Sequence, residues 1–399
     1  MSLNSTPSAE RVHIGFFGRR NAGKSSVVNA VTNQEMSLVS DVAGTTTDPV
    51  YKAMELLPFG PVVIMDTPGY DDEGALGQLR VKKTKEVLNR CDVAVLVVDS
   101  TLGVTDCDET LIAQFKEKEI PYLIVYNKGD LTPKKSSGQA LCVSAKTGEG
   151  IYELKEALAR LAKTNKEKRC IVGDLLTAGD TVVLVTPIDD AAPKGRLILP
   201  QQQTLRDILD ADAVAVVTKE TTLPQTLKQL KTLPAMVITD SQVFDAVSKI
   251  LDQNIPLTSF SILMAKYKGY LQSAVAAIAA IEQLSDGDTV LIAEGCTHHR
   301  QCNDIGTVKI PNWLRAYTKK DIRIETASGT SFPEDLSRYA IIIHCGACML
   351  NEREVRYRLK CAQDAGVPMT NYGVLIAYMQ GILPRSLALF PEIRALLKK

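Results

Sequence analysis

One stretch decides how the first part of the chain folds: Gly18-Arg19-Arg20-Asn21-Ala22-Gly23-Lys24-Ser25. It has the spacing of a phosphate-binding P-loop, and the flanking residues predict a strand over Val12–Gly18 and a helix over Ser25–Thr32. Glycines let backbone N–H groups surround phosphate oxygens, and the helix N-terminus adds partial positive charge. We expect Lys24 to contact the β- and γ-phosphates and Ser25 to bind Mg²⁺. The other expected loop contacts are Gly18, Asn21, Ala22, Gly23 and Ser26.

Three further motifs follow in the order of a guanine-nucleotide site. They are Asp66-Thr67-Pro68-Gly69, Asn127-Lys128-Gly129-Asp130 and Ser144-Ala145-Lys146. Asp66 is expected near the magnesium ion, and the N–H of Gly69 near the γ-phosphate. The Asp130 carboxylate can accept two hydrogen bonds from guanine, whereas adenine lacks those donors. Each motif alone is a common strand-to-loop turn, but their order predicts binding of GTP and GDP.

A threonine-rich segment lies between the first two motifs, at Gly44-Thr45-Thr46-Thr47-Asp48. A switch threonine at this place closes over magnesium, and among the three threonines we assign Thr46. Lys24, Thr46 and Asp66 are therefore the candidate catalytic residues.

Short apolar runs alternate with amphipathic stretches along the whole chain, which predicts an α/β protein. Residues 1–10 are expected to be disordered, and residues 11–165 to form a doubly wound P-loop GTPase domain. A polar stretch from Lys163 to Arg169 is typical of a linker. The expected strands of the first domain are Val12–Gly18, Val62–Asp66, Ala94–Asp99, Tyr122–Asn127 and Ala140–Ser144, with a hairpin at Pro58-Phe59-Gly60-Pro61.

Two further α/β domains are expected, over residues 172–256 and 257–399. The predicted strands are Thr181–Val185, Ala213–Val217 and Met236–Thr239, followed by Thr289–Ala293, Arg323–Ala327, Tyr339–His344 and Met369–Tyr372. A single long helix is predicted over Ser259–Leu284. No internal repeat is evident.

Composition narrows the function classes. The 46 basic residues balance 46 acidic ones, so no global field attracts nucleic acid or anionic lipid. We find neither an apolar run long enough to span a membrane nor a signal core, and we expect a cytoplasmic location. The nine cysteines are an odd number, which argues against a disulfide framework.

Cysteine and histidine gather in one region. Cys296-Thr297-His298-His299 follows one predicted strand, and His344-Cys345-Gly346-Ala347-Cys348 follows another. Ligand sites of open α/β sheets form where the carboxyl ends of strands meet, so the two sets can come together. The pattern is compatible with a zinc site, a redox pair or an iron–sulfur cluster. Three thiolates with an uncertain fourth ligand favour a cluster that leaves one iron accessible.

The nucleotide motifs resemble those of TrmE/Era-type GTPases. In those proteins the asparagine that matches Asn21 helps to bind K⁺ beside the phosphates. Tyr70 stands just after the glycine of the second motif, where Ras-like proteins carry a water-positioning glutamine. The resemblance therefore implies a slow, switch-like GTPase stimulated by a cation.

The order of all motifs along the chain resembles the HydF family of GTPases, which mature FeFe-type hydrogenases. In that family the cysteines that match Cys296, Cys345 and Cys348 bind a 4Fe-4S cluster. The resemblance leaves His298, His344 and Asp304 as candidates for the fourth iron or for supporting hydrogen bonds, while Cys302 lies outside the pattern.

The resemblance also implies a role as scaffold and carrier. The middle domain would form a homodimer and allow a larger assembly, and the third would hold the cluster. A di-iron precursor would be carried to apo FeFe-hydrogenase in cooperation with radical-SAM maturases. The alternative is a TrmE/Era-like, RNA-related GTPase with a structural zinc domain; no basic Gly-x-x-Gly loop supports it, so we expect no nucleic-acid partner.

Overall fold

The computed structural model describes residues 6–33, 49–57, 60–70, 81, 83–133, 138, 140–163, 169–188, 197–295, 304–329 and 331–398. The chain forms two compact units, Met1–Glu167 and Lys168–Lys399. Each unit is described by itself.

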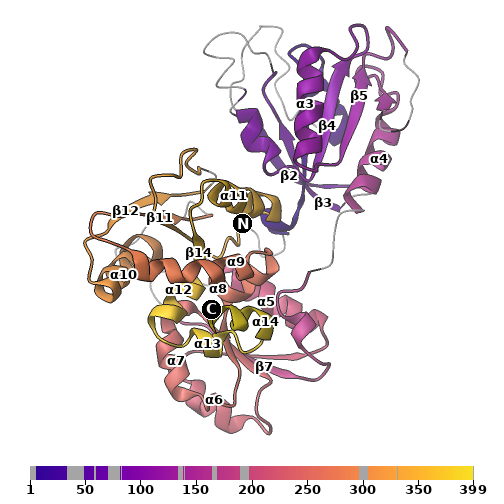
Figure 1. Cartoon of the computed structure of the whole chain (residues 1–399). Helices are drawn as coiled ribbons and strands as arrows, with labels where there is room; N and C mark the ends of the chain where they lie inside the picture. Colours follow the sequence, from indigo (N-terminus) through magenta and orange to yellow (C-terminus); the bar gives the residue numbers. More distant parts are fainter. Residues whose placement is uncertain are drawn as a thin grey trace. The chain divides into compact units, whose positions relative to one another are not determined.

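The first unit is a doubly wound α/β domain (Figure 1). In chain order its elements are η1 (Ser8–Glu10), β1 (Val12–Phe17), α1 (Lys24–Thr32), β2 (Val50–Leu56), β3 (Gly60–Asp66), β4 (Val93–Asp99), α3 (Asp106–Glu117), β5 (Tyr122–Asn127), β6 (Ala140–Cys142) and α4 (Ile151–Lys163).

One six-stranded sheet organises this unit, in the order β2-β3-β1-β4-β5-β6. Only β2 runs antiparallel to its neighbour, β3, as the predicted hairpin requires. Apolar side chains of α1 and α4 cover one face of the sheet, and those of α3 cover the other. The predicted strand Tyr122–Asn127 is confirmed, whereas β6 ends at Cys142, before Ser144.

The second unit contains two four-stranded parallel sheets. The elements around its first sheet are η2 (Gly173–Leu175), β7 (Thr181–Val185), α5 (Leu199–Asp210), β8 (Val214–Thr218), α6 (Leu223–Gln229), β9 (Met236–Thr239), η3 (Ser241–Val243), α7 (Phe244–Ile250), β10 (Leu257–Ser259), α8 (Phe260–Tyr267), α9 (Leu271–Ala276) and η4 (Ala277–Gln283).

The elements around the second sheet follow in the chain. They are β11 (Thr289–Ala293), η5 (Ile305–Lys309), α10 (Ile310–Thr318), β12 (Arg323–Ala327), β13 (Ile341–His344), α11 (Glu352–Asp364), β14 (Met369–Asn371), α12 (Tyr372–Met379), α13 (Leu383–Ser386), α14 (Pro391–Arg394) and η6 (Ala395–Lys398).

The two sheets, with the elements around them, are copies of one arrangement. The first copy runs from η2 to η4, and the second copy runs from β11 to η6. The first has the order β10-β9-β7-β8 and the second β14-β13-β11-β12, so each strand has a counterpart in the same place. The register also agrees, because Thr181 pairs with Val214 in the first sheet and Thr289 with Arg323 in the second. The expectation that the chain has no internal repeat is therefore wrong.

The sequence repeats where the copies make the same contacts. Gly179-Asp180-Thr181-Val182 recurs as Gly287-Asp288-Thr289-Val290, and Pro256-Leu257-Thr258-Ser259-Phe260 as Pro368-Met369-Thr370-Asn371-Tyr372. The Asp180 carboxylate accepts a hydrogen bond from the N–H of Thr177 at 2.8 Å, and that of Asp288 accepts one from the N–H of Ser285 at 2.8 Å. Few other positions are identical, which conceals the repeat in the sequence.

The predicted long helix over Ser259–Leu284 is wrong. Ser259 ends β10 and caps α8, and the helix stops at Tyr267. Gly269 has φ +78°, a left-handed conformation that ends helices, and Gly381 has φ +72° at the matching position after α12. Apolar side chains continue through α9 and η4, so the helical period persists across the break.

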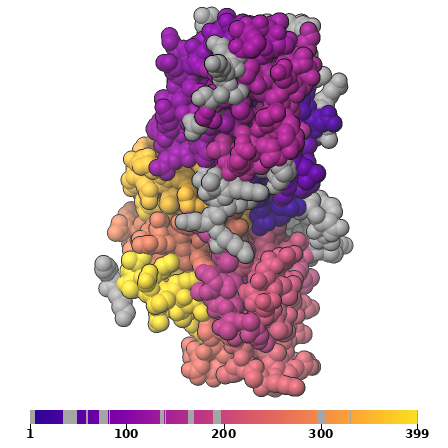
Figure 2. All heavy atoms as spheres, turned by 90° about the vertical axis from the view of Figure 1, so that its right-hand side faces the viewer, coloured from indigo at the N-terminus to yellow at the C-terminus, as the bar shows by residue number. Residues whose placement is uncertain are grey.

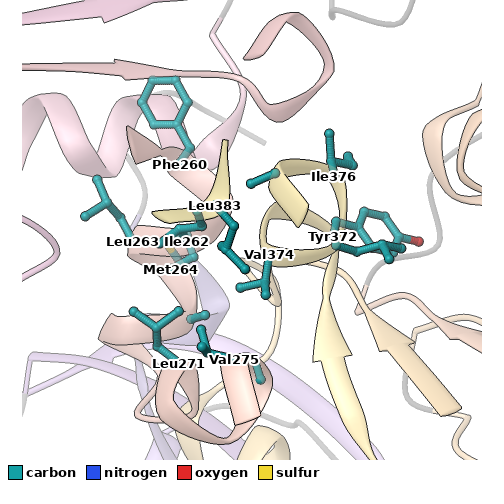
Figure 3. Close-up of a cluster of buried hydrophobic side chains, with 14 of the residues drawn as sticks. Phe260, Ile262, Leu263, Met264, Leu271, Val275, Tyr372, Val374, Ile376 and Leu383 are labelled. Atoms are coloured by element: carbon teal, nitrogen blue, oxygen red, sulfur yellow. The ribbon is translucent and has the colours of Figure 1, made fainter. Parts of the chain in front are cut away.

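The copies interlock through the segments that follow α8 and α12. The helix α9 contacts β14 of the second copy, and α13 contacts β10 of the first. Figure 3 shows the result, with apolar side chains of α8 and α9 packed among those of α12 and α13. At the surface, in yellow in Figure 2, the C-terminal residues lie beside the first copy, where the Arg385 guanidinium donates to the carbonyl of Ser248 at 3.1 Å.

Within the part of the chain that the structure describes, no helix has both the length and the apolar character needed to cross a membrane.

The interlocked core predicts unequal effects at two matching threonines. The Thr370 hydroxyl donates to the carbonyl of Ala274 at 2.9 Å, so Thr370→Val should lower the free energy of unfolding of the second unit by about 1–3 kcal/mol. The matching Thr258 hydroxyl is fully buried and has no hydrogen-bond partner among the described residues, so Thr258→Val should be neutral or stabilising. Calorimetry of the intact chain measures both, and equal losses would contradict the expectation.

Candidate nucleotide and metal sites

The P-loop is shaped by two glycines that have no room for a side chain. A Cβ on Gly18 would lie 2.3 Å from the carbonyl oxygen of Val97, and one on Gly23 would lie 2.2 Å from Nδ2 of Asn127. Gly23 also has φ +79° and directly precedes α1. Asn21 has φ +63°, so the loop turns sharply between the two glycines. These constraints fix a tight backbone turn, the kind of loop whose N–H groups can surround phosphate oxygens.

Ser25 and Asp66, two of the residues expected around magnesium, meet beside this loop. The Ser25 hydroxyl donates to Oδ2 of Asp66 at 2.8 Å, and Nζ of Lys24 lies 3.6 Å from Oδ1 of the same carboxylate. Lys24 and Asp66 are both buried, and Ser26 follows half-buried on the first turn of α1. A cation, a hydroxyl and a carboxylate thus converge where Mg²⁺ and phosphate oxygens would bind.

The second motif lies against the P-loop. The Thr67 hydroxyl donates to the carbonyl of Phe16 at 2.7 Å, and the N–H of Tyr70 donates to the carbonyl of Gly18 at 3.2 Å. A Cβ on Gly69 would lie 3.0 Å from Cα of Arg20. The Tyr70 side chain is buried among apolar residues. These contacts hold the end of β3 against the phosphate loop.

Asn127 joins the phosphate loop to the expected base pocket. Its amide donates to the carbonyl of Ala22 at 3.1 Å, and its side-chain oxygen accepts from the N–H of Ala145 at 3.1 Å. The Ser144 hydroxyl donates to Asp130 at 2.7 Å and orients that carboxylate. Lys146 is exposed.

Sequence reasoning missed Asp99, which pairs with Lys128 of the third motif. Burial opposes ionisation of Asp99, but hydrogen bonds from Lys128 and Thr101 outweigh it and hold the pKa of Asp99 below its usual value. Lys128 has φ +64°, so this ion pair helps to fix an unusual backbone conformation. The sequence signal that could have identified Asp99 is its position as an aspartate at the end of an apolar strand, β4.

Several predicted site residues lie outside the described residues. They are Thr46, Cys296, His298 and, among the residues left open, Cys302.

A thiol site lies at the carboxyl ends of β11 and β13. Cys345 follows β13, and its Sγ accepts hydrogen bonds from the N–H groups of Gly295, at 3.1 Å, and Ala347, at 3.3 Å. Ala347 has φ +56°, which tightens the turn from Cys345 to Cys348. Such N–H···S bonds are typical around metal-bound thiolates. Gly295, the last described residue before Cys296, therefore lies beside Cys345 at this sheet edge.

His344 supports this loop. Its ring is fully buried, with Nδ1 2.9 Å from the carbonyl of Cys345 and Nε2 3.2 Å from Nη1 of Arg358. Burial, aided by the Arg358 charge, lowers the pKa of His344 to about 3, so the ring is neutral at pH 7. Because Nδ1–H donates and Nε2 accepts, both ring nitrogens are used within the protein. The sequence left two roles open for His344, as a ligand of the fourth iron or as a source of supporting hydrogen bonds. The geometry favours the second role.

Two buried carboxylates lie near the thiols. Asp304 accepts from the N–H of Thr307 at 2.7 Å and caps η5. Glu294, which sequence reasoning missed, accepts from the Tyr372 hydroxyl at 3.2 Å. Burial first, and then the charges of Glu294, Cys345 and Asp304, raise the pKa of Tyr372 well above its usual value, which places these groups in one neighbourhood.

The described residues alone do not form a metal site. Among them, no three His, Cys, Asp or Glu side chains are arranged to hold a metal ion.

Three family models match the chain. They are the hydrogen maturase F dimerization domain over residues 171–269, the hydrogen maturase F tetramerization domain over 272–389, and the 50S ribosome-binding GTPase over 13–128.

Similar proteins match mainly the first unit. The tRNA modification GTPase MnmE of Endomicrobium trichonymphae is 34% identical over 182 residues, which are 42% of this chain and 40% of that protein. GTPase Der of Clostridium acetobutylicum is 30% identical over 198 residues, 44% of this chain and 45% of that protein. The chain thus spans about two fifths of the length of the curated relatives it matches. A crystal structure of Era with MgGDPNP and 16S ribosomal RNA is 18% identical, has a TM-score of 0.36, and covers 55% of this chain and 98% of its own.

Two glycines with similar backbone angles test the phosphate loop. Gly23 has φ +79° and no free space, whereas Gly103 has φ +76° and no atom within 4 Å of the place that a Cβ would take. We expect Gly23→Ala to weaken binding of a fluorescent GTP analogue at least ~10-fold, because the Cβ displaces Asn127 and opens the loop. Gly103→Ala should cost about 1–2 kcal/mol of stability and leave affinity unchanged. Wild-type affinity in Gly23→Ala would show that the loop does not bind phosphate.

Proposed function

The chain belongs to the hydrogen maturase F family, and on that premise we propose that it is a GTP-hydrolysing scaffold and carrier in the maturation of FeFe-type hydrogenases. The observation that carries this proposal is the thiol pair Cys345 and Cys348 at a strand end, inside residues 272–389, which match the hydrogen maturase F tetramerization domain. In this proposal the chain is divided into a GTPase domain over residues 11–165, a dimerisation domain over 172–256 and a cluster domain over 257–399.

The GTPase domain would act as a slow switch. Lys24 would hold the β- and γ-phosphates, and Ser25, Asp66 and Thr46 would surround Mg²⁺. Asn21 would help to bind K⁺. Gly69 would respond to the γ-phosphate, and its close packing against the Arg20 backbone, where a Cβ would lie 3.0 Å from Cα of Arg20, supports this role. Asn127, Lys128, Asp130, Ser144, Ala145 and Lys146 would select guanine.

The thiol site fits a 4Fe-4S cluster. Two thiols lie in one tight turn, two N–H groups already point at Cys345, and Cys296 follows the residue that supplies one of them. Cys296, Cys345 and Cys348 would bind three irons, with His298 or Asp304 as candidates at the fourth. When bound, the cluster would supply electron storage and an iron open to an outside ligand.

The remaining parts of the proposal concern partners. The chain would carry a di-iron precursor to apo FeFe-hydrogenase, act with radical-SAM maturases and work in the cytoplasm. An RNA-related GTPase with a zinc domain is not favoured, because residues 171–389 match hydrogen maturase F domains.

Homodimer formation is proposed at the β8 edge. Val214 and Val217 on this edge strand are 50% and 44% exposed. The matching edge strand of the second copy, β12, carries Arg323 and Thr326 at these positions. Charged residues protect sheet edges from pairing, whereas exposed valines favour it. Of these two matching edge strands, β8 is therefore the one that can pair with another molecule of the same protein.

Single cysteine replacements test the cluster. Cys345→Ser and Cys348→Ser should each remove most of the bound iron and change the reduced-state EPR spectrum, because each removes a thiolate within ~2.3 Å of its iron. Cys361→Ser, on α11 of the same unit, is the matched control and should keep both. Iron, sulfide and EPR are measured on anaerobically purified protein, followed by activation of apo-hydrogenase. Full iron and full activation in both variants would refute the proposal.

A single charge tests the dimer edge. Val214→Arg copies the residue at the matching position of β12 and should convert the dimer to a monomer at micromolar concentration. Leu233→Arg changes another exposed residue of the same unit and should leave the mass unchanged. Light scattering that finds a dimer in both variants would exclude the β8 edge.

A further inference from the structure

The internal repeat provides a cysteine-free copy of the thiol site for comparison. Val182 pairs with Met236 in the first sheet, and Val290 pairs with Ile341 in the second. Counting along the strands from these pairs, Thr239 matches His344 and Asp240 matches Cys345. The fold is the same at both edges, so differences between them mark what the thiol site requires.

One such difference lies after α8. The N–H of Lys268 donates to the carbonyl of Met264 at 2.9 Å, and the N–H of Gln380 donates to that of Ile376 at 3.1 Å. Each residue precedes a glycine with a left-handed conformation. Lys268 and Gln380 therefore hold the same position in the two copies, and only the copy that faces the cysteines has a cation there.

The Lys268 charge is buried beside the thiol loop. The residue is 2% exposed, and its Nζ donates to the carbonyl of Leu350 at 2.8 Å, two residues beyond Cys348. Its charge is close enough to act on the Cys348 thiol. A buried ammonium is costly and is retained where it interacts with negative charge.

The other buried charges of this neighbourhood do not replace it. Arg358 is paired with Glu354 at 3.0 Å, so its charge is largely balanced locally. Glu294 is a buried acid that accepts a hydrogen bond from the Tyr372 hydroxyl, so it supplies no positive charge. Among the fully buried side chains that the structure describes here, Lys268 thus places a positive charge on the Cys348 side of the loop.

We propose that Lys268 is a positioning residue that places a positive charge beside the cysteine loop. This charge raises the reduction potential of the iron–sulfur cluster bound by Cys345 and Cys348. The inference rests on the cluster in the proposed function. Adding one electron to a cluster held by thiolates adds one negative charge, and a fixed cation in a low-dielectric site stabilises the reduced form more than the oxidised form.

The test replaces Lys268 by the residue of the other copy. Lys268→Gln keeps a side chain that the matching backbone position already accepts and removes the charge. We expect reduction to become at least ~10-fold less favourable, a fall in midpoint potential of about 59 mV for one electron. Lys360→Gln removes an exposed cation near Arg358 on α11 and should leave the potential unchanged. The readout is an EPR-monitored redox titration, with iron content measured on each sample.

The outcomes separate this inference from the function on which it rests. A wild-type protein without iron and sulfide would refute the proposed function. A full cluster with unchanged potential in Lys268→Gln would refute only the role of Lys268. If Lys268→Gln loses the cluster, Lys268→Arg decides: retention of iron at the wild-type potential supports a role for the charge, and loss of iron there contradicts it.

Discussion

The close approach of α8 to α12 is the contact on which the second unit depends. A Cβ on Gly373 would lie 2.9 Å from both Oγ of Ser259 and Cβ of Ser261, so only glycine permits this distance. The Asn371 amide donates to the carbonyl of Ser261 at 2.9 Å and fixes the two helix starts together. The buried apolar residues of both copies belong to one continuous core, so we expect the two copies to fold as a pair.

The same contact explains how one copy could become a chemical site while the other did not. Since α8 crosses into the second copy, its end places Lys268 and Tyr270 beside the cysteine loop, where the Tyr270 hydroxyl donates to the carbonyl of Cys345 at 3.1 Å. At the end of α12 the matching residues are Gln380 and Ile382, which supply neither a cation nor a phenol. The thiol site is therefore built from both copies, and its specialised residues are distributed between them.

The sequence predicted local features better than those that depend on distant contacts. The strands Thr181–Val185 and Thr289–Ala293 were predicted at their observed bounds, because continuous apolar runs are typical of buried parallel strands. Arg323–Ala327 was also predicted at its observed bounds, and its mixed polar and apolar residues suit its place at the edge of the sheet. The predicted long helix is not observed because Gly269, in a left-handed conformation, follows the end of α8 at Tyr267, although the apolar side chains continue at a helical period beyond it.

The internal repeat and the role of Glu294 were not predicted from the sequence, for a related reason. The copies conserve their hydrogen bonds and apolar positions with few identical residues, so the similarity is evident only once the strands are paired. A lone glutamate after an apolar strand carries no pattern of its own, and only the fold reveals that Glu294 is buried beside Tyr372 and the thiols. The nucleotide motifs, in contrast, have fixed spacing, because a loop that surrounds phosphates tolerates little variation in length.

A chain of buried hydrogen bonds explains why the cysteine loop needs residues that never touch a metal. The Glu354 carboxylate accepts from Nε of Arg358, whose Nη2 donates to the carbonyl of Gly329 at 2.6 Å. With these donors fixed, Nη1 can only donate to His344, which forces that ring to place its own proton on Nδ1. That proton holds the carbonyl of Cys345, and the Tyr270 hydroxyl donates to the same oxygen. A buried ion pair adds little net stability compared with apolar packing. Its effect here is to select one tautomer and one direction for the Cys345 peptide, which keeps Sγ facing the N–H groups of Gly295 and Ala347.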